Sequence, residues 1–282
     1  MHDQREIVER RIRRTIDERI RPTIHTVGPA LDVEAWVVPG EPVTPTAARS
    51  AVYEPFEIGG VWGEPWGTTW FRCSGEYPAG WPAAGQSVEV LIDLGFGRGP
   101  GFQAEGLLYA VDEGGPIRGV HPLHQAVPAA MVGDGRRVGF LLEAASNPII
   151  APSHAPTPFG DPATAPPGPL YRLRQCHLAL RNDDVWHLDL DLQVVVGLMY
   201  ELGLDDPRRA ELLVAIEDAL DALDLHDVPG TAGAGRDRLR PILEAPAAAS
   251  AHQTTLVGHA HIDTAWLWPR RETRRKCART YS

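Results

Sequence analysis

Cysteine and lysine are scarce in this 282-residue sequence, which has three cysteines and a single lysine, Lys276. Cys73, Cys176 and Cys277 are far apart and form no C-x-x-C pair. They therefore predict neither a disulfide framework nor a cysteine metal site. The sequence also lacks a long apolar run, and no apolar leader follows its charged first residues. It therefore predicts no membrane span, and we expect a cytoplasmic location.

An excess of positive charge is also missing, because 37 acidic residues outnumber 27 lysines and arginines and the formal net charge is −10. That balance argues against nucleic acid or an anionic membrane as a general partner. The basic run Arg270–Arg279 is local, and we expect it to form a solvated or ion-paired helix face. The sequence does not decide the oligomeric state, and a homo-oligomer is compatible with it.

The first 20 residues predict an amphipathic helix that Asp3 can cap and that ends at Arg21-Pro22. Four isoleucines lie near one stripe of this helix: Ile7, Ile12, Ile16 and Ile20.

From about Asp32 to Leu180 the pattern is that of short strands separated by glycine and proline turns, which predicts an antiparallel sandwich. The expected strands are Thr68–Ser74, Ser87–Leu94, Gly106–Val111, Arg137–Ala144 and Tyr171–Leu180. Within this region Ala151–Pro169 is rich in proline, and we expect an irregular or extended loop there.

Two helices are expected next, one over Val185–Leu202 and one that begins at Asp206-Pro207 with proline in its first turn. Gly230–Gly235 contains three glycines and predicts a flexible break. Pro246–Ser250 then leads into the last segment of the sequence.

That last segment contains the densest group of chemically active residues. Leu256–Gly258 predicts a short buried strand, and side chains two apart on a strand share a face, so His259, His261 and Asp263 would point the same way. Imidazole nitrogen and carboxylate oxygen are common zinc ligands. Hydrogen-bonded structure is the plainer interpretation of the same pattern. From Thr264 the pattern favours a helix, with Trp266 on its opening turn where the indole could stack on a sugar.

Residues 258–269 read Gly-His-Ala-His-Ile-Asp-Thr-Ala-Trp-Leu-Trp-Pro, followed by a helix rich in arginine and glutamate. This stretch closely resembles the start of the catalytic domain in family 38 of the glycoside hydrolases, the class II α-mannosidases, and above all their cytosolic and bacterial branch. Three upstream segments, Trp66–Phe71, Tyr77–Trp81 and Glu105–Tyr109, resemble the N-terminal domain of the same branch more weakly.

The resemblance implies roles for four residues. His261 and Asp263 match the first two zinc ligands of the family, and Trp266 matches the aromatic residue that stacks on mannose. His259 matches a histidine that supports the site without binding metal. Cobalt suits the same ligands as zinc. The implied activity is a glycosidase that removes terminal non-reducing α-D-mannose from oligosaccharides with retention of configuration.

The predicted fold is mixed. An N-terminal helix and lead-in (1–31) precede an antiparallel β-sandwich domain (32–182) and a helical connector (183–250). Residues 251–282 would begin an α/β barrel of the seven-stranded type that this chain does not complete. We therefore expect the segment after Ser250 to be poorly packed, and the nucleophile and acid to lie downstream of Ser282. On this view the 282 residues alone are an inactive part of a glycosidase.

Two other functions stay open. A metallohydrolase of the amidohydrolase or metallo-β-lactamase type also uses His-x-His clusters, but Thr264 stands where the latter has a further histidine. An inactive fragment or a sugar-binding sandwich is the other, with a stacking platform formed by Trp62, Trp66, Trp70 and Trp81. We favour core packing for these tryptophans. Three further histidines without metal-ligand spacing are expected at the surface: His121, His124 and His154.

Overall fold

A computed structural model describes residues 5–97, 99, 103–149, 168–246, 253–266 and 268–282. Asp3, most of the proline-rich segment and residues 247–252 lie outside the described residues, so the expectations for them are not examined. The chain forms two compact units. The helical unit comprises Met1–Thr26, Pro82–Ser87 and Leu180–Leu256, and the β unit comprises Val27–Trp81, Val88–Ala179 and Val257–Ser282.

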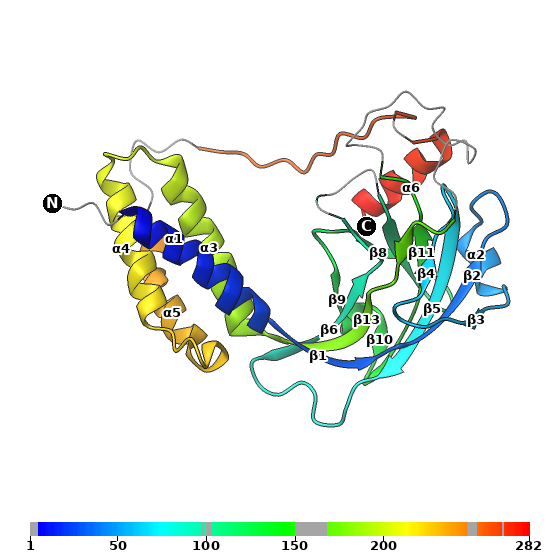
Figure 1. Ribbon diagram of the computed structural model, residues 1–282, viewed down its shortest axis with the longest axis horizontal. Coiled ribbons are helices and arrows are strands. Elements are labelled where there is room, and N and C mark those ends of the chain that lie inside the picture. Colours follow the sequence, from blue (N-terminus) through cyan, green and yellow to red (C-terminus); the bar gives the residue numbers. More distant parts are fainter. Residues whose placement is uncertain (1–4, 98, 100–102, 150–167, 247–252, 267) are drawn as a thin grey trace. The chain divides into compact units, whose positions relative to one another are not determined.

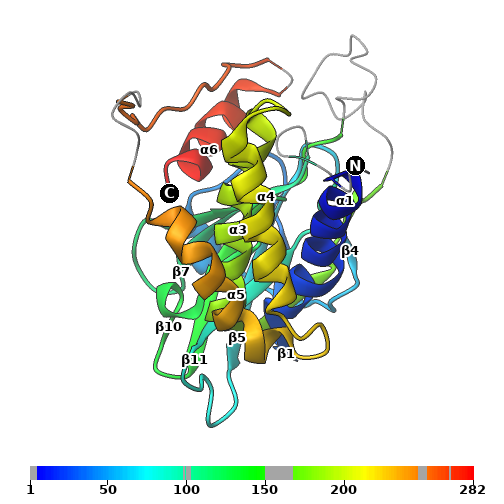
Figure 2. The ribbon, with the colours of Figure 1, turned by 90° about the vertical axis from the view of Figure 1, so that its left-hand side faces the viewer.

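The helical unit packs its helices around one apolar core (Figures 1 and 2). Its helices are α1 (Arg5–Thr15), the π turn Ile16–Ile20, the 3₁₀ turn Arg21–Thr23, α3 (Asp183–Glu201), α4 (Pro207–Asp221) and α5 (Val228–Leu243). Ile12, Ile16 and Ile20 are buried in this core, whereas Ile7, expected in the same stripe, is exposed. The predicted N-terminal helix is therefore confirmed from Arg5 onward, and its apolar stripe begins one turn later than expected.

Helix α5 contradicts the predicted flexible break at Gly230–Gly235, because these residues lie inside it. The side chain of Asp227 accepts the N–H of Gly230 at 3.0 Å and so caps the helix. Val228, Ala232 and Leu239 bury one face against the core. Tertiary packing and the cap outweigh the low helix propensity of glycine.

The β unit contains a seven-stranded sheet with the order β3-β2-β5-β11-β7-β8, and β10 pairs with β11 beside this path (Figure 1). Its strands are β2 (Asp32–Val37), β3 (Glu54–Pro55), β5 (Thr68–Glu76), β7 (Glu105–Ala110), β8 (Pro116–Val120), β10 (Gly133–Asp134) and β11 (Arg137–Ala145). The pairs β2–β5, β5–β11, β11–β7 and β7–β8 are all antiparallel.

A four-stranded sheet with the order β1-β13-β6-β9 packs on it through a shared apolar core, and β12 pairs with β4. These strands are β1 (His25–Ala30), β4 (Val61–Trp62), β6 (Gln86–Asp93), β9 (Ala126–Pro128), β12 (Tyr171–Arg172) and β13 (Gln175–Asn182). The mixed fold with antiparallel strands is therefore confirmed. The strand expected over Tyr171–Leu180 is interrupted, because β12 and β13 join different sheets.

The other face of the seven-stranded sheet has a smaller apolar core. The short helix α2 (Pro45–Arg49) contributes Ala48 to it, and α6 (Arg270–Thr280) contributes Ala278. The alternative of an aromatic platform at the surface is excluded: Trp62, Trp66 and Trp70 are buried, and Trp81 packs against the sandwich core. Their burial confirms the core-packing interpretation.

Among the described residues no helix combines the length and apolarity needed to span a bilayer.

Candidate metal and sugar-binding site

The segment that carries the expected site residues is extended and exposed. Leu256 is 92% exposed and Val257 is 78% exposed, so the predicted buried strand at Leu256–Gly258 is wrong. A strand needs a neighbour that satisfies its backbone groups, and no described strand pairs with these residues. The helix expected from Thr264 begins instead at Arg270, after Pro269, so Trp266 precedes it.

The expectation that everything after Ser250 packs poorly holds for only part of the segment. Residues 253–259 are exposed, which agrees with it. Helix α6 contradicts it, because Glu272, Arg275, Lys276 and Arg279 are buried. Of the two forms expected for the basic run Arg270–Arg279, solvated or ion-paired, the ion-paired form is confirmed, because charged side chains hold the helix.

His261 and Asp263 are the two predicted site residues that the structure brings together. Their Nε2 and Oδ1 atoms are 3.2 Å apart, and their side chains are 81% and 41% exposed. His259 is exposed as well.

These two donors fit part of a zinc site. Two ligands at about 2.1 Å from a tetrahedral zinc ion lie about 3.4 Å from each other, close to the observed His261–Asp263 separation. In the described part of the chain no group of three or more His, Cys, Asp or Glu side chains is arranged to hold a metal. The pair can therefore supply two ligands, and further ligands would have to come from other residues or from substrate.

Two tryptophans follow the pair and have different environments. Trp266 is 50% exposed, and its ring meets that of Trp268 edge-on at a centroid distance of 6.0 Å. Trp268 is buried, donates its indole N–H to Thr273 Oγ1 at 3.1 Å, and lies 4.5 Å from Lys276 Nζ, which sits over its ring. Trp266 therefore presents an aromatic face to solvent, and Trp268 fixes the local backbone.

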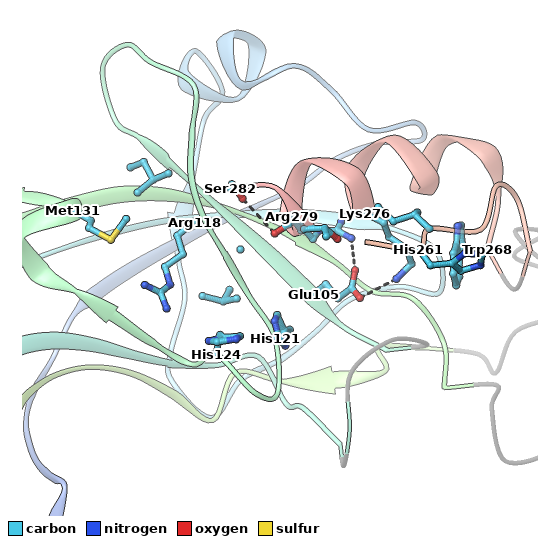
Figure 3. Close-up of a pocket in the computed structure, with 15 residues that line it drawn as sticks. Glu105, Arg118, His121, His124, Met131, His261, Trp268, Lys276, Arg279 and Ser282 are labelled. Atoms are coloured by element: carbon cyan, nitrogen blue, oxygen red, sulfur yellow. Dashed lines mark hydrogen bonds and ion pairs between the residues drawn. The ribbon is translucent and has the colours of Figure 1, made fainter. Parts of the chain in front are cut away.

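A cavity of about 560 Å³ lies beside His261, between α6 and the end of β8 (Figure 3). His261, Ile262 and Trp268 line it from the motif segment, whereas Asp263 and Trp266 are not among its lining residues. The sandwich contributes other polar side chains to the wall: Arg118, His121 and His124. A space of this size accommodates a small polar molecule such as a monosaccharide.

Sequence reasoning placed His121 and His124 at the surface without a role, and they form one wall of this cavity. Their rings meet edge-on at 4.8 Å. Burial, the neighbouring His124 and Arg118 lower the pKa of His121, and Glu105 opposes the shift. A neutral His121 can both donate and accept hydrogen bonds, which suits sugar hydroxyls. His154 lies outside the described residues.

Glu105 is the carboxylate in the cavity wall, and it is paired with two cations of α6. Its two oxygens are 2.9 Å from Lys276 Nζ and 2.6 Å from Arg279 Nη1. Both oxygens of the only carboxylate among the described lining residues are therefore occupied by ion pairs, and the other polar groups of the wall include imidazole and guanidinium side chains.

Two family models match this chain, one over the sandwich and one over the segment that carries His261 and Asp263. The model of the α-mannosidase jelly roll domain matches residues 28–179, more than half of the chain. The model of the glycosyl hydrolases family 38 N-terminal domain matches residues 251–282, which include His261, Asp263 and Trp266. The chain belongs to the α-mannosidases of glycoside hydrolase family 38.

Three relatives have related names. Alpha-mannosidase 2C1 of Mus musculus is 28% identical over 239 residues, and that of Homo sapiens is 28% identical over 235 residues. Alpha-mannosidase G of Dictyostelium discoideum is 21% identical over 240 residues. The alignments cover 82%, 81% and 82% of this chain but 21%, 21% and 20% of the relatives. The chain thus spans about a fifth of the length of the curated relatives it matches.

Proposed function

We propose that this chain forms part of a retaining α-mannosidase that removes terminal α-D-mannose from oligosaccharides in the cytoplasm. The observation that carries the proposal is the His261–Asp263 pair, with its donor atoms 3.2 Å apart, inside the segment that matches family 38. Membership in family 38 supports the proposed reaction class. The exposed His261–Asp263 pair beside a cavity of monosaccharide size supports this segment as the place where the sugar binds.

In this proposal His261 and Asp263 hold zinc, or cobalt in its place, and Trp266 stacks on the terminal mannose. A bound zinc ion would polarise sugar hydroxyls and favour the distorted ring that precedes bond cleavage. His259 would orient the ligand pair from beside it. His121, His124 and Arg118 would donate hydrogen bonds to the remainder of the glycan.

The nucleophilic aspartate and the acid that protonates the leaving oxygen are proposed to come from residues beyond this sequence. Glu105, the carboxylate in the cavity wall, supports this view because its charge is already paired. Residues 251–282 would then be the start of the catalytic domain, after a sandwich domain at 32–182 and a helical connector at 183–250.

The test is an assay of the natural protein with aryl α-mannoside, aryl β-mannoside and aryl α-glucoside. We expect hydrolysis of the α-mannoside alone, stoichiometric zinc, and release of α-mannose as the first product seen by NMR. Hydrolysis of the β-mannoside or α-glucoside at an equal rate, or a first product with inverted configuration, would overturn the proposal.

His261→Ala and Asp263→Asn should each remove bound zinc and lower kcat/KM by at least about 100-fold, as for other groups that stabilise transition-state charge. The matched control is His226→Ala, which removes an exposed imidazole from the helical unit. Full zinc content in His261→Ala would contradict the assignment of that residue.

A further inference from the structure

The outer face of the seven-stranded sheet carries two buried carboxylates side by side. Glu143 of β11 lies opposite Leu107 of β7, and Ala145 lies opposite Glu105. Alternate residues of a strand share a face, so Glu105 and Glu143 are on the same face as the apolar Leu107. Both carboxylates are buried. Two like charges on one sheet face are unfavourable unless cations meet them.

Helix α6 supplies those cations. Arg275 Nε is 3.0 Å from Glu143, Lys276 Nζ is 2.9 Å from Glu105, and Arg279 Nη1 is 2.6 Å from Glu105. The helix also brings Glu272, which is paired with Arg275 at 3.2 Å and Arg279 at 2.5 Å. Asn147, just after β11, donates to Glu272 at 2.9 Å. We call this cluster of six charged residues the ionic clamp.

The clamp is balanced in charge. Its three carboxylates are Glu105, Glu143 and Glu272, and its three cations are Arg275, Lys276 and Arg279. The sheet brings two negative charges, and the helix brings a net charge of plus two. Burial of ions is favourable only when each charge is paired with an opposite charge. The ion pairs therefore favour a single position of α6 on the sheet.

Backbone packing defines the same position. Gly119 of β8 lies beneath α6, and a Cβ atom on it would come within 2.6 Å of the carbonyl oxygen of Arg279. The helix backbone can approach the sheet this closely because residue 119 has no side chain.

The clamp is linked directly to the motif segment. Thr273 Oγ1 accepts the backbone N–H of Ala265 and the indole N–H of Trp268, both at 3.1 Å. Lys276, which pairs with Glu105, also covers the Trp268 ring. Ala265 has a φ of 52°, a conformation that a non-glycine residue holds only when its surroundings fix it. The chain of contacts runs from the sheet through α6 to the residues just after Asp263.

We propose that the sandwich domain positions the His261–Asp263 segment through the ionic clamp, so that Glu105 and Glu143 are positioning residues for the metal site. The role assigned to the segment rests on the proposed function. Each carboxylate acts on the segment through α6, Thr273 and Trp268.

The test compares Glu143→Gln with Glu76→Gln in the natural protein. Glu76 lies on β5 of the same sheet and pairs with Arg136 in an exposed ion pair. Glu143→Gln leaves three buried cations against two carboxylates. We expect it to weaken Co²⁺ binding, followed by the visible absorption of the bound ion, by about 10–100-fold. The backbone amides of Ala265, which is bonded to Thr273 Oγ1, and of α6 should also exchange hydrogen faster. Glu76→Gln should change neither quantity.

A double variant separates positioning from general damage to the fold. Glu143→Gln with Arg275→Gln restores two carboxylates against two cations, so Co²⁺ affinity should recover toward that of the natural protein. Gly119→Ala leaves every charge in place and should loosen residues 259–268 by displacing the helix. If Glu143→Gln and Gly119→Ala both loosen the motif segment, the docking of α6 on the sheet is the common cause.

The outcomes distinguish the clamp from the activity. If Glu143→Gln lowers the melting temperature but keeps natural Co²⁺ affinity and natural exchange of the Ala265 amide, the clamp is merely structural and the inference is wrong. If the natural protein binds no metal and cleaves no mannoside, the proposed function fails. Hydrogen exchange of the Ala265 amide then still decides whether the clamp holds the segment.

Discussion

Trp266 and Trp268 are two residues apart in sequence and differ in their surroundings, which separates their expected roles. Trp266 is half exposed beside the His261–Asp263 pair, and Trp268 is buried against Lys276. Lys276, the single lysine of the chain, thus has two partners, the Trp268 ring and the Glu105 carboxylate. The indole of Trp266 is half exposed to solvent, and the buried indole of Trp268 supports the backbone.

We predict that Trp266→Ala in the natural protein raises KM for an aryl α-mannoside about tenfold, because a stacking contact of about 1.4 kcal/mol is lost. Zinc content and melting temperature should stay near those of the natural protein. Trp268→Ala should instead lower the free energy of unfolding by about 3–5 kcal/mol, the usual cost of emptying a buried aromatic site. Steady-state kinetics and denaturant unfolding measure both. A large loss of stability in Trp266→Ala would contradict the division of roles.

At the residue scale the sequence predicted what depends on residue type and missed what depends on distance. His261 and Asp263 were named from their residue types, their spacing and the resemblance to family 38, and their metal role stays a prediction. Glu105 and Lys276 are 171 positions apart, and their pairing follows from the strand order and the docking of α6. Nothing in the local pattern of either residue identifies its partner.

At the scale of elements, the predictions that succeeded had strong periodicity. The strands β5, β6, β7 and β11 and the helices α1, α3 and α4 follow from alternating or helical apolar patterns. Two of the failures were α5, where glycines masked a helix, and Leu256–Gly258, where an apolar run has no neighbouring strand. In both cases the deciding interactions are tertiary, and local sequence does not specify them.

The glycines of α5 give a matched pair of variants. A Cβ atom at Gly233 would meet only Asp184, at 3.9 Å. Gly233→Ala should therefore stabilise the protein by about 0.5–1 kcal/mol, by reducing the freedom of the unfolded chain. At Gly235 a Cβ atom would lie 3.0 Å from Leu223 and 3.3 Å from the carbonyl oxygen of Ala219 on α4. Gly235→Ala should lose that gain or destabilise, because α4 and α5 would have to separate.

Denaturant unfolding of both alanine variants measures the difference. Equal stabilisation by Gly233→Ala and Gly235→Ala would mean that α4 and α5 are not in close contact at Gly235. Destabilisation by Gly233→Ala would mean that residues 230–235 are not helical, as the sequence had suggested.

At the scale of the whole molecule, the two segments that match family models are separated in sequence by most of the helical unit. Residues 28–81, 88–179 and 257–282 nevertheless belong to one compact unit, because α6 docks on the sheet. The apolar contribution of the helix to this contact is small, since Ala278 is its member of the outer-face core. Charge therefore contributes most of the specificity of this long-range contact.

The contact should consequently depend on pH. Burial alone would raise the pKa of Glu272, but the charges of Arg279 and Arg275 and the hydrogen bond from Asn147 lower it to about 2 from its usual 4.5. A carboxyl group with a depressed folded-state pKa contributes stability above its unfolded pKa, and loses it as the pH falls through the folded value. We therefore predict that α6 detaches from the sheet as the pH falls from about 4.5 to about 2. The apolar cores described above contain no titratable partner of Glu272, so the prediction concerns α6 alone.

Tryptophan fluorescence and near-ultraviolet circular dichroism, which sense the release of Trp268, should show this transition in the natural protein. Glu272→Gln has no carboxyl group to protonate, so it should lack the acid step and show a loosened α6 already at neutral pH. Glu76→Gln, which changes an exposed ion pair, should keep the acid step. An acid transition that persists unchanged in Glu272→Gln would show that another group holds α6. The contact between the two family segments would then not depend on Glu272.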